Sequence, residues 1–168
     1  IKPILGATYT VFNEEDDIRY DIKCFASNEI GWRNLLLINK EVNVENTRFI
    51  YEKDFLKLTK GLFLILDPKS IEYDRATSIY SDAYFQLDTV EFEDFNRETW
   101  YLDNLKKFFN GIYEPVSITD AFYLDKEDNH IKGKLNTIGG FHEYESKNQY
   151  FKDKEDYFLE LSELFNSE

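Results

Sequence analysis

The stretch "ATYTVFNEEDDIRYDIKCFA" (residues 7–26) predicts the first element of the fold. Apolar and polar residues alternate in each half, and a polar run at 13–17 separates the two halves. Alternation with a period of two is typical of half-buried strands, and two such strands joined by a short polar segment indicate an antiparallel hairpin. The residues that share its apolar face are Ala7, Tyr9 and Val11 in the first strand and Ile18, Tyr20, Ile22 and Cys24 in the second.

The residues after the hairpin predict a mixture of helices and strands. "WRNLLLINKEV" (32–42) is either a third strand or a buried helical turn, because a continuous apolar run is compatible with both. The stretch 44–61 favours a helix late in its course, with Gly61 as its cap. "LFLILDP" (62–68) is typical of a short buried strand that ends at an Asp-Pro pair.

Helical spacing is clearest in "RETWYLDNLKKFFNGIYEP" (97–115). Gly111 suits the cap of this helix, and Pro115 prevents the helix from resuming. The apolar residues that follow a spacing of 3.6 residues, and so predict the buried stripe, are Leu102, Leu105, Phe109 and Ile112.

The C-terminal part of the chain predicts further strands and a last helix. Residues 116–135 indicate a strand, a "DKEDNH" loop and a returning strand, followed by a bend at Gly139-Gly140. "DKEDYFLELSELF" (153–165) predicts an amphipathic helix with Asp153 as its N-cap. The stripe of this helix is Tyr157, Phe158, Leu161, Leu164 and Phe165.

The order of these elements indicates the fold class. The hairpin comes first, and the helices are interspersed without the regular alternation of a parallel α/β fold. We therefore expect a single α+β domain over residues 1–168. In it, two to three helices pack on an antiparallel or mixed sheet, and an amphipathic helix ends the chain.

The composition limits the kinds of partner. The 168 residues carry a net charge of −13, whereas nucleic acids and anionic membranes attract clustered Lys and Arg, so we expect neither as a direct partner. Cys24 is the only cysteine and cannot form an internal disulfide, which favours a reducing, cytoplasmic location. We also expect no cofactor, because the sequence has no glycine-rich phosphate loop, no zinc-ligand spacing and no serine-nucleophile motif.

The surplus of acidic residues is concentrated in the middle of the chain, where residues 61–125 carry thirteen acids and five bases. Within it, "IYSDAYFQLDTVEFEDFNRETWYLD" (79–103) holds seven carboxylates, seven aromatic residues and one cation. The apolar parity changes in the middle of this stretch, which predicts a bulge or a turn there. Either arrangement directs Asp88, Glu91 and Glu93 to solvent. Because closely spaced like charges on a strand repel each other, their presence suggests a use for the negative potential.

These patterns predict a non-enzymatic protein, a monomer or dimer, that captures a basic protein partner with its acidic surface. Proteins that act on nucleic acids carry a complementary positive groove. We therefore expect an inhibitor of such an enzyme, of the kind represented by immunity proteins and phage-encoded inhibitors. The residues predicted to bind the partner are Asp82, Tyr84, Asp88, Glu91, Glu93, Asp94, Glu98 and Tyr101.

The alternative is a metal-dependent nuclease, in which spaced carboxylates hold Mg²⁺ and a lysine assists the attacking water. Glu145 and Lys147, preceded by Asp125 or alternatively by Asp120 or Asp128, occur in a suitable order. The net charge, however, would repel a polyanionic substrate. Another carboxylate-based hydrolase, such as a glycosidase, would depend on a separation between two carboxylates that the sequence does not give. The "DKEDNH" segment also lacks the Gly and the bidentate Glu of a calcium loop.

Overall fold

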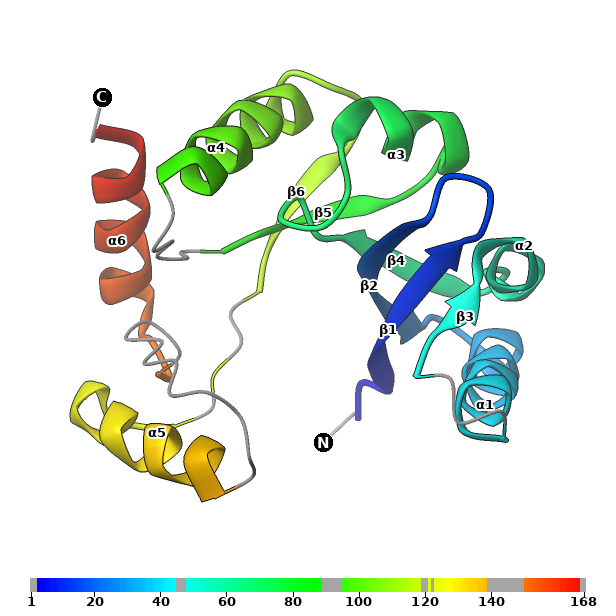
Figure 1. Ribbon diagram of the computed structural model, residues 1–168, viewed down its shortest axis with the longest axis horizontal. Helices are drawn as coiled ribbons and strands as arrows, with labels where there is room; N and C mark the ends of the chain where they lie inside the picture. Colours follow the sequence, from blue (N-terminus) through cyan, green and yellow to red (C-terminus); the bar gives the residue numbers. More distant parts are fainter. Residues whose placement is uncertain are drawn as a thin grey trace. The chain divides into compact units, whose positions relative to one another are not determined.

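The computed structural model shows an α+β protein whose mixed sheet opens with the predicted hairpin (Figure 1). It describes residues 3–44, 48–88, 95–118, 121, 123–138 and 150–166. The chain divides into two compact units, the first formed by Ile1–Gln86 and Trp100–Val116 and the second by Leu87–Thr99 and Ser117–Glu168. Each unit has its own internal packing, and the single domain over residues 1–168 stays a prediction.

Strands β1 (Gly6–Asn13) and β2 (Ile18–Ala26) form the predicted antiparallel hairpin. Val11 lies opposite Tyr20, so one face of the hairpin collects the alternating apolar residues. Ile18 is an exception at 37% exposed, because it is the first residue of β2, next to the turn. The buried residues of this face are Tyr9, Val11, Tyr20, Ile22 and Cys24.

The sheet has six strands in the order β3-β1-β2-β4-β5-β6. β3 (Ile50–Tyr51) pairs parallel with β1, and β4 (Leu62–Leu66) pairs antiparallel with β2. β5 (Tyr84–Leu87) pairs parallel with β4, and β6 (Glu114–Ser117) is the outer strand. This mixture of parallel and antiparallel neighbours confirms the predicted fold class, and β4 confirms the short strand expected over 62–68.

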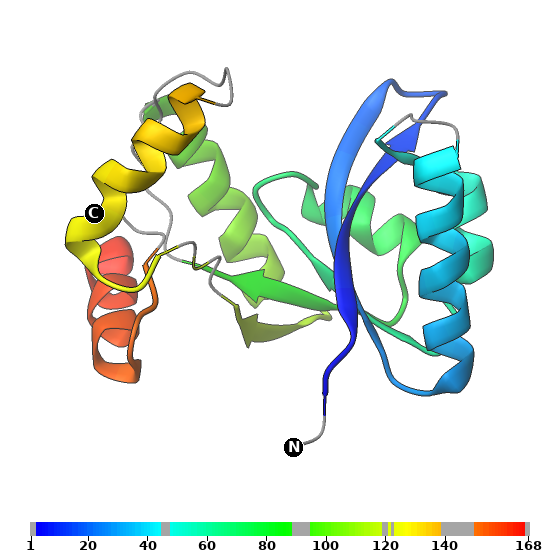
Figure 2. The same cartoon turned by 90° about the horizontal axis from the view of Figure 1, so that it is seen from below.

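The ambiguous apolar run at 32–42 is part of a helix, α1 (Glu29–Val44). This helix lies along one face of the hairpin (Figure 2), and Leu35 and Ile38 are its buried apolar residues. The hydroxyl of Tyr9 donates to the carbonyl oxygen of Leu35 at 3.3 Å, which ties α1 to β1. The stretch 32–42 is longer than the roughly eight residues that buried strands rarely exceed, and this length favours the helix over the strand.

The helix expected late in 44–61 is present in a shortened form. It consists of α2 (Glu52–Phe55) and the 3₁₀ turn η1 (Leu56–Leu58), and the fully buried Phe55 holds it on the core. Gly61 follows with a φ of +78°, and its carbonyl group lies against Gly31 of α1. A side chain at either glycine would collide with the backbone of the other, so the close approach of α1 to this turn requires both.

Helix α3 (Tyr73–Ile79) packs against the part of α4 (Phe95–Phe109) that belongs to the first unit, from Trp100 on, through rings and a buried amide. The rings of Tyr73 and Phe108 lie 5.3 Å apart. The side chain of Asn104 accepts the backbone N–H of Tyr73 at 2.9 Å. It also donates to the carbonyl oxygens of Pro68 and Ile71, at 2.8 and 2.9 Å. Asn104 therefore fixes α4 against the segment that leads into α3.

The helix predicted over 97–115 is confirmed, but its buried stripe is displaced by one residue. Leu105 is buried as expected, whereas Phe109 is 42% exposed and Ile112, beyond the end of α4, is 64% exposed. The physical reason is that Asn104 and the rings of Tyr101 and Phe108 face the core in place of Phe109 and Ile112. The buried residues of α4 are Tyr101, Asn104, Leu105 and Phe108.

The described part of the second unit is mainly helical. The strand expected to return after the "DKEDNH" segment is wrong, because this segment forms the 3₁₀ turn η2 (Lys126–Asp128) and the start of α5 (Asn129–Ile138). The final helix is confirmed as α6 (Lys154–Asn166), and Asp153 caps it by accepting two backbone N–H groups. Tyr157 and Leu161 of its predicted stripe are buried. Phe158, however, is 57% exposed.

The described residues contain six α-helices, more than the two to three helices on the sheet and one C-terminal helix that we expected. None of these helices has the length and apolar character needed to cross a membrane. The bend predicted at Gly139-Gly140 lies outside the described residues.

Candidate functional site

The predicted acidic surface falls only partly within the described residues. Asp82 is exposed, and Tyr84 is half-buried; both belong to the first unit. Glu98 is half-buried in α4 and belongs to the second unit. The predicted change of apolar parity lies outside the described residues, together with three of the predicted binding residues, Glu91, Glu93 and Asp94.

Two of the predicted binding residues are buried, and the prediction that Asp88 points to solvent is wrong. Asp88 is 6% exposed and Tyr101 is 1% exposed. β5 ends at Leu87, so the alternation of a strand does not extend to Asp88. Burial, with a smaller contribution from the charge of Asp88, raises the pKa of Tyr157, whose hydroxyl donates to the carbonyl oxygen of Leu87 at 2.7 Å. Tyr101 belongs to the displaced core stripe of α4, so neither side chain is placed to contact a partner.

Acidic side chains at α3 and α4 gather around one lysine of the first unit. Lys107 Nζ lies 3.0 Å from Asp74 Oδ2. The hydrogen bond to Asp74 and its charge, with smaller contributions from Glu72 and Asp103, raise the pKa of Lys107. Trp100 is 37% exposed and lies three residues before Asp103, so the two share one side of α4. We call Glu72, Asp74, Trp100, Asp103 and Lys107 the α3–α4 face.

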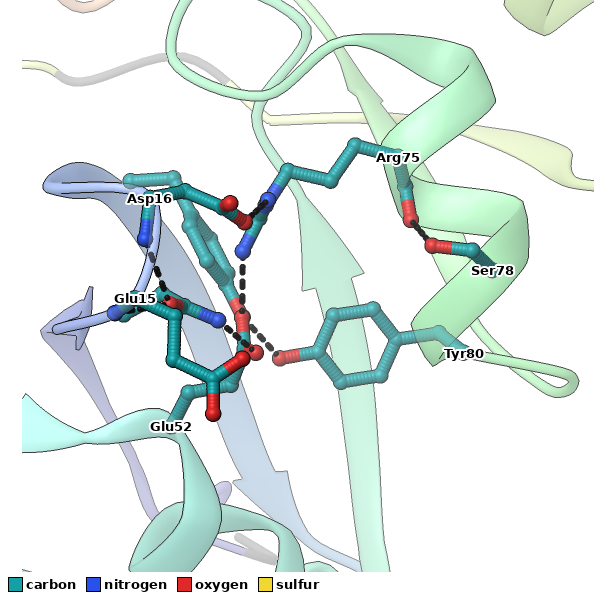
Figure 3. Close-up of polar contacts among 8 residues, drawn as sticks. Glu15, Asp16, Glu52, Arg75, Ser78 and Tyr80 are labelled. Carbon is teal, nitrogen blue, oxygen red and sulfur yellow. Dashed lines mark hydrogen bonds and ion pairs between the residues drawn. The ribbon is translucent and has the colours of Figure 1, made fainter.

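A second polar cluster joins the tip of the hairpin to α2 and α3 (Figure 3). Glu52, the first residue of α2, accepts hydrogen bonds from Asn13 Nδ2 at 2.7 Å and from the Tyr20 hydroxyl at 2.8 Å. Arg75 Nη2 lies 3.3 Å from the same carboxylate, and Arg75 Nη1 lies 2.6 Å from Asp16 Oδ2. The side chains of Glu52 and Arg75 are 13% and 17% exposed, so this ion pair is largely buried.

Two tyrosines extend the cluster into the core. The hydroxyl groups of Tyr20 and Tyr80 lie 2.8 Å apart. Because Tyr20 donates its proton to Glu52, Tyr80 is the donor in this second bond. Burial is the main cause that raises the pKa of both phenols, and both stay protonated near neutral pH. They are 1% and 3% exposed, which excludes them as nucleophiles toward a substrate in solution.

The hairpin tip is held in place by this network. The side-chain oxygen of Asn13 accepts the backbone N–H groups of Glu15 and Asp16, at 2.8 and 3.2 Å. Burial alone would lower the pKa of Arg75, but the hydrogen bond to Asp16 and the charge of Glu52 raise it. Arg75 is therefore a permanent cation that links the tip to α3. The cluster has the properties of a structural network that shapes the surface around it.

A pocket of about 260 Å³ opens beside this cluster, between the hairpin tip and α2. The rings of Phe12 and Tyr51, on neighbouring strands, lie 6.0 Å apart in its wall. Lys53 Nζ lies 3.3 Å from Glu14 Oε2 and 5.4 Å from the centre of the Tyr51 ring. The residues that line this hairpin-tip pocket are Phe12, Asn13, Glu14, Glu15, Tyr51, Glu52, Lys53 and Leu56.

Of the carboxylates and the lysine considered for a nuclease site, only Asp125 and the alternative Asp128 lie in the described part of the chain. No group of three or more His, Cys, Asp or Glu side chains among the described residues is placed to hold a metal ion. Asp125 is exposed just before η2, and Glu145 and Lys147 lie outside the described residues.

No protein-family model and no curated protein matches this chain.

Proposed function

We propose that this protein is a non-enzymatic binding protein that captures a basic protein partner through its α3–α4 face. The observation that supports this function is the grouping of three carboxylates, Glu72, Asp74 and Asp103, around a single lysine and beside a partly exposed tryptophan. Asp82 follows α3 in the chain, is exposed, and forms no ion pair within the described residues. Glu72, Asp74 and Asp103 against Lys107 give the α3–α4 face more negative than positive charge.

Such a face has two physical uses in binding. Its potential attracts a positively charged protein from a distance, which raises the rate of association. Trp100 then supplies the contact energy, because an exposed aromatic side chain desolvated in an interface is a common binding hot spot. Asp82 and Tyr84, which belong to the first unit, are the residues of the predicted surface that we retain in this role.

The partner that suits this chemistry has an extended positive surface. Enzymes that act on nucleic acids have one, since neutralising phosphates supplies much of their affinity. We therefore propose an inhibitor of such an enzyme, of the immunity-protein or phage-encoded kind, that acts in the cytoplasm. The acidic side chains would occupy the partner's groove in place of nucleic acid.

The test uses the full chain as bait in an extract of its source cells, followed by kinetics with the recovered partner. A variant with Glu72→Gln, Asp74→Asn and Asp103→Asn removes three negative charges from the α3–α4 face. We expect its association rate at low salt to fall by about tenfold or more, because electrostatic steering contributes factors of roughly 10 to 1,000. Its rate should also depend less on salt than that of the unaltered protein.

The matched control changes the same number of charges elsewhere. Glu155, Asp156 and Glu163 are exposed on α6, and their replacement by Gln, Asn and Gln gives the same net charge as the first variant. If the association rates of the two variants fall by the same factor, the net charge of the protein attracts the partner and the α3–α4 face has no special role. Recovery of acidic partners only would refute the proposed function itself.

A further inference from the structure

The hairpin-tip pocket has the dimensions of a receptor for one side chain. Its volume of about 260 Å³ lies below the roughly 300–1,000 Å³ of pockets that enclose whole small molecules. Phe12 and Tyr51 lie opposite each other in the β1–β3 register and form an aromatic wall, and Leu56 of η1 adds an aliphatic contact. An extended aliphatic stem with a polar head fits these walls.

The charge of the pocket selects the head group. Three carboxylates line it, and Lys53 is the one cation among the lining residues. Glu52 is already engaged by the largely buried Arg75, and Glu14 is paired with Lys53. Glu15 is exposed at the hairpin tip and forms no ion pair within the described part of the chain. A carboxylate beside aromatic faces favours a cation, because the ring faces also attract positive charge.

Lys53 shows that an ammonium group binds in this surrounding. Its Nζ lies near both kinds of group that favour a cation in this pocket, a carboxylate (Glu14) and an aromatic face (Tyr51). The side chains of Lys53 and Glu14 are 68% and 52% exposed, however. An ion pair so exposed contributes at most about 1 kcal/mol, so an incoming cation can displace it.

We propose that the hairpin-tip pocket binds a lysine or arginine side chain of the basic protein partner, and that Lys53 competes with it for the same groups. The identity of the partner rests on the proposed function, but the recognition of a cation rests on the pocket alone. The stem of the incoming side chain lies along Phe12, Tyr51 and Leu56. Its head group pairs with Glu15 and with Glu14, which Lys53 releases. Lys53 moves into solvent as the partner side chain enters.

The test uses small probes that carry the two head groups, butylammonium and butylguanidinium chloride, with 1-pentanol as the uncharged control. Each is titrated into the isotopically labelled full chain while the amide resonances of residues 12–17 and 51–56 are followed by NMR. We expect saturable shifts with one or both cations and none with pentanol. Equal shifts with pentanol, or no shift with either cation, would refute a cation site.

Three single variants separate a specific site from general charge. Glu15→Gln should weaken cation binding by about threefold, the effect expected of one exposed ion pair. Asp17→Asn is the matched control, because Asp17 is an exposed carboxylate of the same tip that does not line the pocket. Lys53→Gln should strengthen binding by about threefold, since it removes the competing ammonium. If Asp17→Asn weakens binding as much as Glu15→Gln, or if Lys53→Gln has no effect, the proposal is wrong.

The two proposals fail in distinguishable ways. Binding of the cationic probes without any basic partner in the extract would leave the pocket standing as a cation site and remove the partner from the proposal. A partner that binds the Glu15→Gln and Lys53→Gln variants as it binds the unaltered chain, but loses the α3–α4 variant, would overturn the role of the pocket and keep the proposed function.

Discussion

Two carboxylates in the short helix α2 lie in contrasting surroundings. Glu52 is 13% exposed and accepts hydrogen bonds from three other segments of the chain. Asp54 is 42% exposed, and among the described residues it pairs only with Lys57, one turn away, at 2.7 Å. Removing the charge at each position therefore compares how much a largely buried network and an exposed ion pair contribute to the stability of the protein, within a single helix.

We expect Glu52→Gln to lower the free energy of unfolding by about 3 kcal/mol, because it leaves the buried Arg75 with Asp16 as its remaining ionic partner. Asp54→Asn should cost at most about 1 kcal/mol, as exposed pairs do. Urea denaturation of both variants at neutral pH measures the difference. Equal losses would mean that the Glu52 network contributes no more than a surface ion pair.

The residues of this network could not be found from the sequence. The residues of the network share no spacing in the sequence. They meet because the fold brings both α2, with Glu52, and α3, with Arg75, beside the hairpin. The predicted exposure of Asp88 was wrong because it assumed the alternation of a strand, and β5 ends one residue before Asp88. In contrast, the burial of Cys24 followed directly from the alternation in β2.

Helix α4 depends on one polar residue for its position in the first unit. Asn104 is 4% exposed and bonds to Tyr73, Pro68 and Ile71, all outside its own helix. We expect Asn104→Ala to lower the free energy of unfolding by about 3 kcal/mol, because it leaves buried backbone groups without partners. Asn110→Ala is the control, since the Asn110 side chain is exposed and, within the part of the chain that the structure describes, bonds only to the carbonyl oxygen of Lys106.

The control variant should stay within about 0.5 kcal/mol of the unaltered protein, as surface substitutions usually do. Thermal or urea unfolding of both variants provides the measurement. A loss below about 1 kcal/mol for Asn104→Ala would indicate that water or a local shift satisfies the exposed backbone groups. In that case the aromatic contacts of Tyr73 and Phe108, not the amide, would hold α4 in place.

The elements differ in how well the sequence predicts them, and the difference has a physical cause. The hairpin and α6 were predicted correctly because strict alternation and an N-cap are local signals. The register of α4 was missed because a buried amide, Asn104, replaces an apolar residue in its core stripe. Helix α5 was missed although Ile131, Leu135 and Ile138 have the i, i+4, i+7 spacing of a helix face.

At the scale of the whole molecule, the first unit buries several groups that ionise at alkaline pH. Burial raises the pKa of Tyr9, Tyr113 and Cys24 to about 12 each. It is also the main cause that raises the pKa of Tyr20 and Tyr80. In an unfolded chain, tyrosine ionises near pH 10 and cysteine near pH 8.5, so the folded protein holds these groups neutral where the unfolded chain would ionise them.

The sign of the pH dependence follows from these shifts. A pKa raised by folding contributes stability that is complete below the unfolded pKa and is lost as pH rises towards the folded pKa. We expect the free energy of unfolding to begin to fall above about pH 8.5, when Cys24 would ionise in the unfolded chain. The fall should steepen above about pH 10, when each buried phenol costs up to about 1.4 kcal/mol per pH unit.

Urea denaturation at a series of alkaline pH values, with tyrosinate absorbance followed in parallel, measures this effect. The phenols of Tyr9, Tyr20, Tyr80 and Tyr113 should titrate only as the protein unfolds, after the exposed tyrosines have ionised. Tyr80→Phe should make the free energy of unfolding fall less steeply with pH in the alkaline range, because it removes one phenol whose pKa is raised by folding. If all twelve tyrosines ionise together near pH 10 while the circular dichroism of the fold is unchanged, the buried hydroxyl network around Tyr20 is open to water.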